Sequence, residues 1–127
     1  MSPSTTSLPP ELPMSPTLNG PVLIIGSGLL GASIGLGLHA AGYEDVYVQD
    51  ISPTAEAVAQ DIGAGTSFSS LTEDQRARFE PQLVVVAAPP DVAGTVCAQA
   101  LRAYGPRPET GYPGATVTDV ASVKVRP

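Results

Sequence analysis

A glycine-rich apolar stretch, VLIIGSGLLGASIGLGLHAAG from Val22 to Gly42, constrains the fold of this chain more than any other feature. It contains six glycines and no aspartate, glutamate, lysine or arginine. Its length suits a membrane-spanning helix of about 20 residues, and the spacing of Gly31 and Gly35 is typical of helices packed closely in membranes. Residues 26–28, however, interrupt the stretch after only four strong apolar residues. We therefore expect a short buried strand, a tight turn and a helix.

Short apolar runs and helical segments alternate along the rest of the chain. Strands are expected at residues 22–26, 45–50, 66–70 and 83–90, with a fifth ending near Asp119. Helices are expected at residues 29–41, from 52 or 53 to about 63, from 72 onward, and at 91–103. Such alternation is typical of right-handed βαβ units. It predicts an α/β fold of the Rossmann-like, doubly wound type, with a parallel sheet of about five strands where the complete fold has six.

Short local signals support these boundaries. The Ser-Pro dipeptide at residues 52–53 suits the N-cap and first turn of a helix, and the Thr-x-x-Gln pattern that begins at Thr72 resembles a capping box. Gly42 is expected to end its helix in the left-handed conformation. Gly35 and Gly37 are expected to allow close contact between the first helix and the sheet.

Composition and charge narrow the classes of function. A chain of 127 residues has room for one domain, and residues 1–20, rich in proline, serine and threonine, are expected to be a disordered leader before a folded domain of residues 21–127. A net charge of −6 without a dense basic cluster argues against nucleic acid or a membrane surface as partner. The single cysteine, Cys97, allows no internal disulfide and no metal-ligand spacing. We expect no metal, a cytoplasmic location, and Cys97 on the buried side of its helix.

A phosphate-binding motif follows the first expected strand. The pattern G-x-G-x-x-G is matched by Gly26, Ser27, Gly28, Leu29, Leu30 and Gly31. In this pattern the first glycine permits a sharp turn, the second lets a pyrophosphate approach bare backbone, and the third lets the helix lie close to the strand. The free N–H groups and the positive end of the helix dipole would then bind the anion without a lysine. The sequence therefore predicts dinucleotide binding.

An acidic residue ends the second strand at the expected distance from this motif. Asp50 lies 19 residues after Gly31, and a carboxylate about 20 residues on typically binds the adenosine ribose. Because it would repel a 2′-phosphate, the predicted cofactor is NAD rather than NADP. Four loops, at residues 26–31, 50–52, 87–91 and 119–124, are expected to meet at one crevice beyond the strand ends. The predicted cofactor-binding residues there also include Ile51, Ser52, Ala88 and Pro89.

The segment TDVASVK, from Thr118 to Lys124, is the most specific feature after the glycine loop. With the loop GSGLLGASIGLGL and the APP turn, in this order and spacing, it resembles the amino-terminal domain of the prephenate dehydrogenase family, which includes arogenate dehydrogenases. The resemblance covers about residues 21–126. It implies the NAD-dependent oxidative decarboxylation of prephenate to 4-hydroxyphenylpyruvate in tyrosine biosynthesis. It also implies that Ser122 is an active-site serine, which bonds near the reacting hydroxyl and the nicotinamide.

The resemblance leaves out two of the family's functional residues. Its catalytic histidine and the arginine that clamps the substrate carboxylate have no counterpart here, the arginine belonging to a helical dimerisation domain. The chain is therefore expected to be the truncated front part of a longer, homodimeric enzyme and to turn over little or no prephenate alone. His39, near the carboxyl end of the first helix, is not expected to act as the missing base. A dehydrogenase of arogenate or of a β-hydroxy acid, and a non-catalytic NAD-sensing module, are the alternatives.

Overall fold

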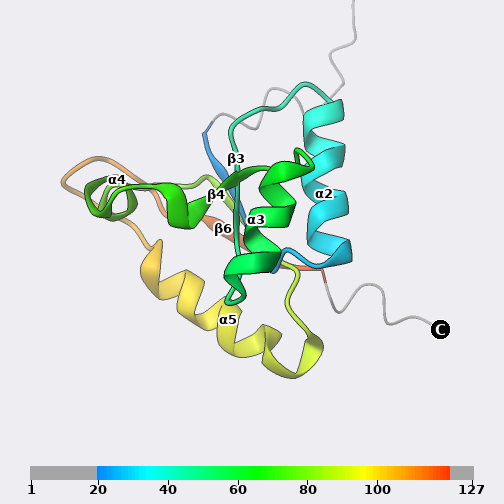
Figure 1. Cartoon of the computed structure of the whole chain (residues 1–127). Coiled ribbons are helices and arrows are strands. Elements are labelled where there is room, and N and C mark those ends of the chain that lie inside the picture. Colours follow the sequence, from blue (N-terminus) through cyan, green and yellow to red (C-terminus); the bar gives the residue numbers. More distant parts are fainter. Residues whose placement is uncertain (1–19, 121–127) are drawn as a thin grey trace, which may run out of the picture.

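The computed structural model describes residues 20–120, which form a parallel sheet with helices on both faces (Figure 1). The elements in chain order are β2 (Val22–Ile25), α2 (Leu29–Ala40), β3 (Val46–Gln49), α3 (Pro53–Asp61), β4 (Thr66–Ser67), the short 3-10 helix η1 (Phe68–Ser70), α4 (Glu73–Ala77), β5 (Leu83–Val86), α5 (Pro90–Ala103) and β6 (Thr116–Asp119). Residues 1–19 of the predicted leader, together with Ser122 and Lys124, lie outside the described residues.

The five strands form one sheet in the order β4-β3-β2-β5-β6, and every neighbouring pair is parallel. All four residues of β2 pair with β3 on one side and with β5 on the other. The chain therefore reverses its direction of travel across the sheet between β4 and β5, which places the topological switch point between β2 and β5. All strands end at the same edge, and the predicted fold class is confirmed.

Alternate residues along the strands face two separate cores, as the pleat of a strand requires. The core under α2 and α3 contains Val22, Ile24, Val46, Val48, Ala59, Ala64 and Val85. The core under α5 contains Leu23, Phe68, Phe79, Val84, Val86, Ala88, Ala93 and Ala100. Figure 1 shows α2 beside α3, with α5 separate from both. Burial on both faces explains why β2 and β5 are continuous apolar runs rather than alternating ones.

The glycine-rich stretch divides into β2 and α2 instead of forming one long helix. Helix α2 has 12 residues, and no helix within residues 20–120 is long and apolar enough to cross a bilayer. The helix ends at Ala40, and Gly42 follows with φ of 93°, in the left-handed region predicted for it. The signals at Ser52 and Thr72 are also confirmed, because Ser52 caps α3 and Thr72 forms a complete capping box at α4.

Two glycines of α2 that were expected to behave alike do not. A Cβ atom on Gly35 would lie 2.1 Å from the carbonyl oxygen of Ala64, so α2 packs directly against the backbone that leads into β4. A Cβ atom on Gly37 would meet nothing within 4 Å. The expected close packing is therefore wrong at Gly37, which lies on the exposed side of the helix.

The third and fourth strands are shorter than expected. The strand expected at residues 66–70 ends at Ser67, because the chain turns there into η1 and buries Phe68 in the core. The strand expected at residues 83–90 ends at Val86, and α5 begins at Pro90 rather than residue 91. Proline has no N–H to donate to a strand ladder, whereas its fixed φ suits the first turn of a helix.

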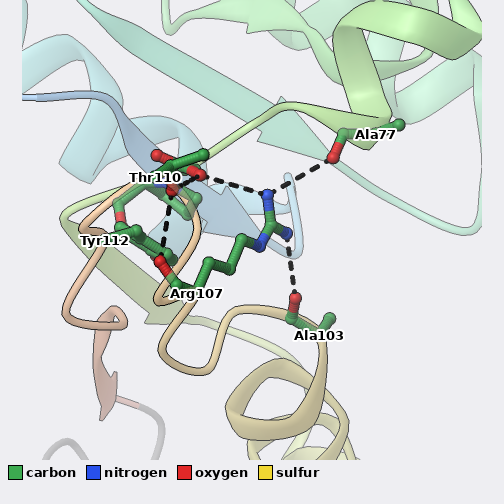
Figure 2. Close-up of polar contacts among 7 residues, drawn as sticks. Ala77, Ala103, Arg107, Thr110 and Tyr112 are labelled. Carbon is green, nitrogen blue, oxygen red and sulfur yellow. Dashed lines mark hydrogen bonds and ion pairs between the residues drawn. The ribbon is translucent and has the colours of Figure 1, made fainter.

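A loop between α5 and β6 is held at the edge of the sheet where the strands begin. Figure 2 shows the guanidinium of Arg107 between the carbonyl oxygens of Ala77 and Ala103, each at 3.3 Å. The guanidinium also lies 5.6 Å from the ring centre of Tyr112, whose hydroxyl donates to the carbonyl oxygen of Pro81 at 2.5 Å. Pro81 precedes β5, so these contacts lie at the edge opposite the strand ends.

Candidate functional site

Three of the four loops expected at the crevice meet at the carboxyl ends of the strands. They follow β2, β3 and β5, and they enclose a cavity of about 380 Å³. That volume falls in the range of roughly 300–1,000 Å³ typical of small-molecule sites. The lining residues, all from these three loops or the helix starts beside them, are Gly26, Gly28, Leu30, Asp50, Ile51, Ala87, Ala88, Pro89 and Pro90. The described part of the fourth loop ends at Val120, whose N–H donates to the Val86 carbonyl oxygen.

The first and third glycines of the motif have no space for a side chain. Gly26 has φ of 102°, and a Cβ on it would lie 2.9 Å from the carbonyl group of Ala87. A Cβ on Gly31 would lie 1.8 Å from the carbonyl oxygen of Gly26, so the start of α2 rests directly on the turn. At Gly28, by contrast, a Cβ would meet nothing within 4 Å. The turn is closed where it meets the protein and open where a ligand would approach.

The amino end of α2 points its unpaired backbone groups at this open side. The helix begins at Leu29, its N-cap is Gly28, and no side chain caps it. The first N–H groups of a helix have no partner inside the helix, and the helix dipole adds partial positive charge there. The end of α2 can therefore bind an anionic group through backbone alone.

Asp50 joins the glycine loop to the end of β3. Its Oδ2 accepts hydrogen bonds from the backbone N–H of Ser27 at 2.7 Å and from the Ser27 hydroxyl at 2.9 Å, and its Oδ1 accepts from the N–H of Ser52 at 2.8 Å. Partial burial alone would raise the pKa of Asp50, but the hydrogen bonds from Ser27, Ser52 and Ile51 outweigh it and hold the pKa below its usual value. Asp50 is thus an ionised acceptor at the edge of the cavity.

Glu56, in the first turn of α3, is a part of this site that the sequence reasoning missed. Its side chain is buried, with a relative exposure of 2%. It accepts hydrogen bonds from the Asp50 N–H at 2.9 Å, the Ser69 N–H at 2.9 Å and the hydroxyl of Ser67. These bonds outweigh the effect of burial, which alone would raise the pKa of Glu56, and the pKa is lowered. Acidic residues are common in the first turn of helices, where they interact favourably with the helix dipole. The sequence alone therefore gave no sign that Glu56 belongs to the site.

An apolar extension of the cavity runs along the first half of α5. A hollow of about 120 Å³ adjoins this cavity, and its lining includes Val92 and Val96 together with Ile25. The two share Gly26, Asp50, Ile51, Ala88 and Pro89. Ile51 is fully exposed and Val92 is more than one-third exposed, so both sides of this hollow present apolar groups to solvent. Val92 and Val96 were not predicted as cofactor-binding residues. They lie four residues apart, and this spacing places both on one face of the helix that follows the APP turn.

The remaining predicted residues take different positions. Ser27 and Ser52 bond to Asp50, whereas Leu29 is largely exposed and does not line the cavity. Ser122 lies outside the described residues, so its predicted role stays a prediction. His39 lies in the last turn of α2, where its Nδ1 is 3.1 Å from the Gly35 carbonyl oxygen. That position is at the end of α2 away from the cavity.

Comparison with known proteins identifies relatives of this chain. The family model described as "NADP oxidoreductase coenzyme F420-dependent" matches residues 21–107. A probable prephenate dehydrogenase of Streptomyces niveus, NovF, is 41% identical over 68 residues, which are 54% of this chain and 17% of that protein. The chain thus matches only a small part of the length of this relative.

Solved structures show the same fold. Prephenate dehydrogenase from Aquifex aeolicus, in complex with hydroxyphenyl propionate and NAD+, superposes with a TM-score of 0.60 at 24% identity, over 80% of this chain and 33% of that chain. A second structure of the Aquifex aeolicus enzyme gives a TM-score of 0.59 at 26% identity, over 77% of this chain and 33% of that chain. The 3-hydroxyisobutyrate dehydrogenase of Mycobacterium tuberculosis, with L-serine, gives a TM-score of 0.53 at 24% identity, over 70% of this chain and 29% of that chain.

The glycine loop, strands β2 to β5 and the family match all concern the same part of the chain. The matched residues 21–107 contain the glycine loop, Asp50 and the turn before α5, and they make up more than half of the sequence. This chain therefore belongs to the family described as NADP oxidoreductase, coenzyme F420-dependent, and its nucleotide-binding domain resembles that of prephenate dehydrogenases.

Proposed function

We propose that this chain binds NAD and is the cofactor-binding part of a prephenate dehydrogenase. The observation that carries the proposal is the pairing of Asp50 with Ser27, which puts a carboxylate beside an uncapped helix start and an open glycine turn. A dinucleotide needs these features side by side, because its pyrophosphate and its adenosine ribose are covalently linked.

The residues at the cavity fit the parts of NAD. The first turn of α2 would hold the pyrophosphate at Gly28, where the backbone is open. Asp50 would accept a hydrogen bond from the ribose at Oδ1, because Oδ2 already accepts two from Ser27 and a carboxylate oxygen has about two acceptor sites. Ile51, Val92 and Val96 would enclose the apolar faces of the adenine. When bound, NAD accepts a hydride at its nicotinamide.

Charge at the cavity supports NAD over NADP. A 2′-phosphate would lie against the ionised Asp50, and like charges at contact distance are unfavourable. The basic side chains among residues 20–120 are those of Arg76, Arg78, Arg102 and Arg107, and none of them lines the cavity. A binding site for a 2′-phosphate typically supplies an arginine there.

The substrate proposal rests on the relatives and on the motif TDVASVK. The curated relative and two solved structures are named as prephenate dehydrogenases. In a longer protein that contains this domain, Ser122 is proposed to bond near the reacting hydroxyl, and a homodimer is proposed to form through another part of the chain. Prephenate consumption and NADH formation by such a protein, compared with its Ser122→Ala variant, test this assignment.

A second candidate function is that of a dehydrogenase with another cofactor or substrate, and the family description favours it. It names NADP and coenzyme F420, and a 3-hydroxyisobutyrate dehydrogenase shares the fold. Titration calorimetry of the 127-residue chain with NAD, NADP and coenzyme F420, each alone, separates the candidates. Binding of NAD at least ten times tighter than NADP is the expected result, whereas tighter NADP binding would overturn the NAD assignment.

A further inference from the structure

Glu56 is a buried carboxylate that has no cation beside it among the described residues. Its hydrogen-bond donors are the backbone N–H groups of Asp50 and Ser69 and the hydroxyl groups of Ser67 and Ser69. Burying a charged group is costly unless it is hydrogen-bonded, and a well-packed apolar side chain often serves stability as well as a buried ion does. Packing alone therefore gives no reason for a carboxylate at this position.

The local topology shows which strand contacts Glu56 replaces. Strand β3 pairs with β4 only at Tyr47 and Val48, because β4 ends at Ser67 and the chain turns away into η1. Asp50, two residues after Val48, has no β4 residue opposite it. The two oxygens of Glu56 occupy this gap: Oε1 accepts the Asp50 N–H, and Oε2 accepts the N–H of Ser69.

Asp50 is consequently held from two directions. Its backbone N–H is bound by Glu56, while its carboxylate is bound by Ser27 and Ser52. Ser52 is also the N-cap of α3, the helix that carries Glu56, so the contacts form a closed ring through Asp50, Ser52, α3 and Glu56. A ring of this kind limits the conformational freedom of the backbone at Asp50.

We propose that Glu56 is a positioning residue for dinucleotide binding, which holds Asp50 at the place where its carboxylate reaches both the glycine loop and the adenosine ribose. This inference rests on the proposed binding of NAD at the same site. Glu56 itself touches no ligand. Its effect on affinity passes through Asp50, because a bond that is already in place before binding removes an ordering cost from the binding step.

The test compares Glu56→Gln with Ser67→Ala in the 127-residue chain. The Asp50 and Ser69 N–H groups donate to different oxygens of Glu56, and in the first variant one of these oxygens becomes an NH₂ group that cannot accept. Ser67→Ala removes one donor and leaves both N–H contacts intact. Titration calorimetry is done at a temperature where circular dichroism shows every variant fully folded. Under that condition a loss of stability alone leaves the Kd for NAD unchanged.

We expect Glu56→Gln to raise the Kd for NAD about tenfold or more, equivalent to about 1.4 kcal/mol, and Ser67→Ala to change it less than threefold. In the Asp50→Ala background, Glu56→Gln is expected to have no further effect, because the two residues act as one unit. Hydrogen exchange at the Asp50 amide is expected to become faster in Glu56→Gln and not in Ser67→Ala. If Glu56→Gln does not fold, Glu56→Asp, which shortens the side chain and keeps its charge, takes its place.

The outcomes separate this inference from the proposed function. Equal NAD affinity of the wild type and the folded Glu56 variant overturns the positioning role alone, and so does a full additional loss in the Asp50→Ala background. A wild-type chain that binds neither NAD nor NADP overturns the proposed function and the inference together.

Discussion

The backbone N–H of Ser27 and the Oδ2 atom of Asp50 lie 2.7 Å apart, although 23 residues separate them in the sequence. The hydroxyl of Ser27 donates to the same oxygen at 2.9 Å. Strands β2 and β3 are therefore joined in two ways: their backbones pair in the sheet, and side-chain contacts link the loops that follow them. The glycine loop and the acidic residue are therefore held together by contacts of the chain itself, and such preorganisation favours binding.

Asp50→Asn is expected to weaken NAD binding by roughly 10- to 100-fold, since hydrogen bonds to charged groups contribute about 1.5–3 kcal/mol. The carboxamide also places an NH₂ group against a donor, either at Ser27 or at Ser52. Asp61→Asn at the exposed end of α3 makes the same change of charge away from the cavity and serves as the control. Calorimetric titration measures both variants, and an equal loss in the two would show that only net charge matters.

Gly31→Ala and Gly37→Ala are expected to have opposite effects, although both lie in α2. A methyl group at Gly31 would overlap the Gly26 carbonyl oxygen, and we expect unfolding to become easier by about 3 kcal/mol or more. At Gly37 the methyl group meets nothing, so alanine should stabilise the helix by about 0.5–1 kcal/mol. Urea denaturation followed by circular dichroism measures both changes. Destabilisation by Gly37→Ala would contradict the open environment of that residue.

Acidification is expected to destabilise the chain through Asp50 and Glu56. The pKa of each carboxyl is lower in the folded chain than the ordinary values of 3.8 and 4.5, because of the hydrogen bonds that each accepts. The unfolded chain therefore binds protons first as the pH falls. The contribution of the two groups is fully present above about pH 4.5–5 and is lost as the pH falls through their folded pKa values.

Urea midpoints between about pH 7 and pH 3 measure this dependence. Glu56→Gln should show a shallower decline than the wild type, while Glu44→Gln, at an exposed glutamate before β3, should follow the wild-type curve. A midpoint that rises on acidification would show that burial, rather than hydrogen bonding, controls these carboxyls.

Tyr112→Phe is expected to lower stability by about 1–2 kcal/mol without changing NAD affinity. The variant leaves the carbonyl oxygen of Pro81 without its hydroxyl partner, at the sheet edge opposite the cavity. Tyr104→Phe removes a hydroxyl that has no hydrogen-bond partner within residues 20–120, so its effect on stability should be small. Thermal denaturation and NAD titration of both variants test whether contacts at this edge affect stability without affecting binding at the opposite edge. A change in NAD affinity in Tyr112→Phe would contradict it.

The doubly wound parallel sheet and the glycine loop could be predicted because each follows from patterns within short stretches of the sequence. Val22 to Ile25 and Leu83 to Val86 are apolar runs of strand length, and right-handed crossovers leave few ways to arrange strands that alternate with helices. The spacing of Asp50 from the glycines follows from the length of one strand-helix-strand unit. These features therefore needed no knowledge of distant contacts.

The end of the third strand and the role of Glu56 could not be predicted in the same way. Ser67 and Ser69 lie 11 and 13 residues after Glu56, and nothing in the intervening sequence indicates that the chain leaves the sheet there. The different surroundings of Gly35 and Gly37 also depend on a residue distant in the sequence, because Gly35 is crowded only by Ala64. Such contacts depend on where two separate elements meet.

The amino-acid sequence by itself determined the alternation of strands and helices, the caps at Ser52 and Thr72 and the residues of the glycine turn, because apolar periodicity, capping groups and glycine act over a few neighbouring residues. Only the tertiary structure decided that Asp50 is bound on one side by Ser27 and on the other by Glu56. The physical reason is that a hydrogen bond requires two groups within about 3 Å, and packing of the sheet and helices sets that distance.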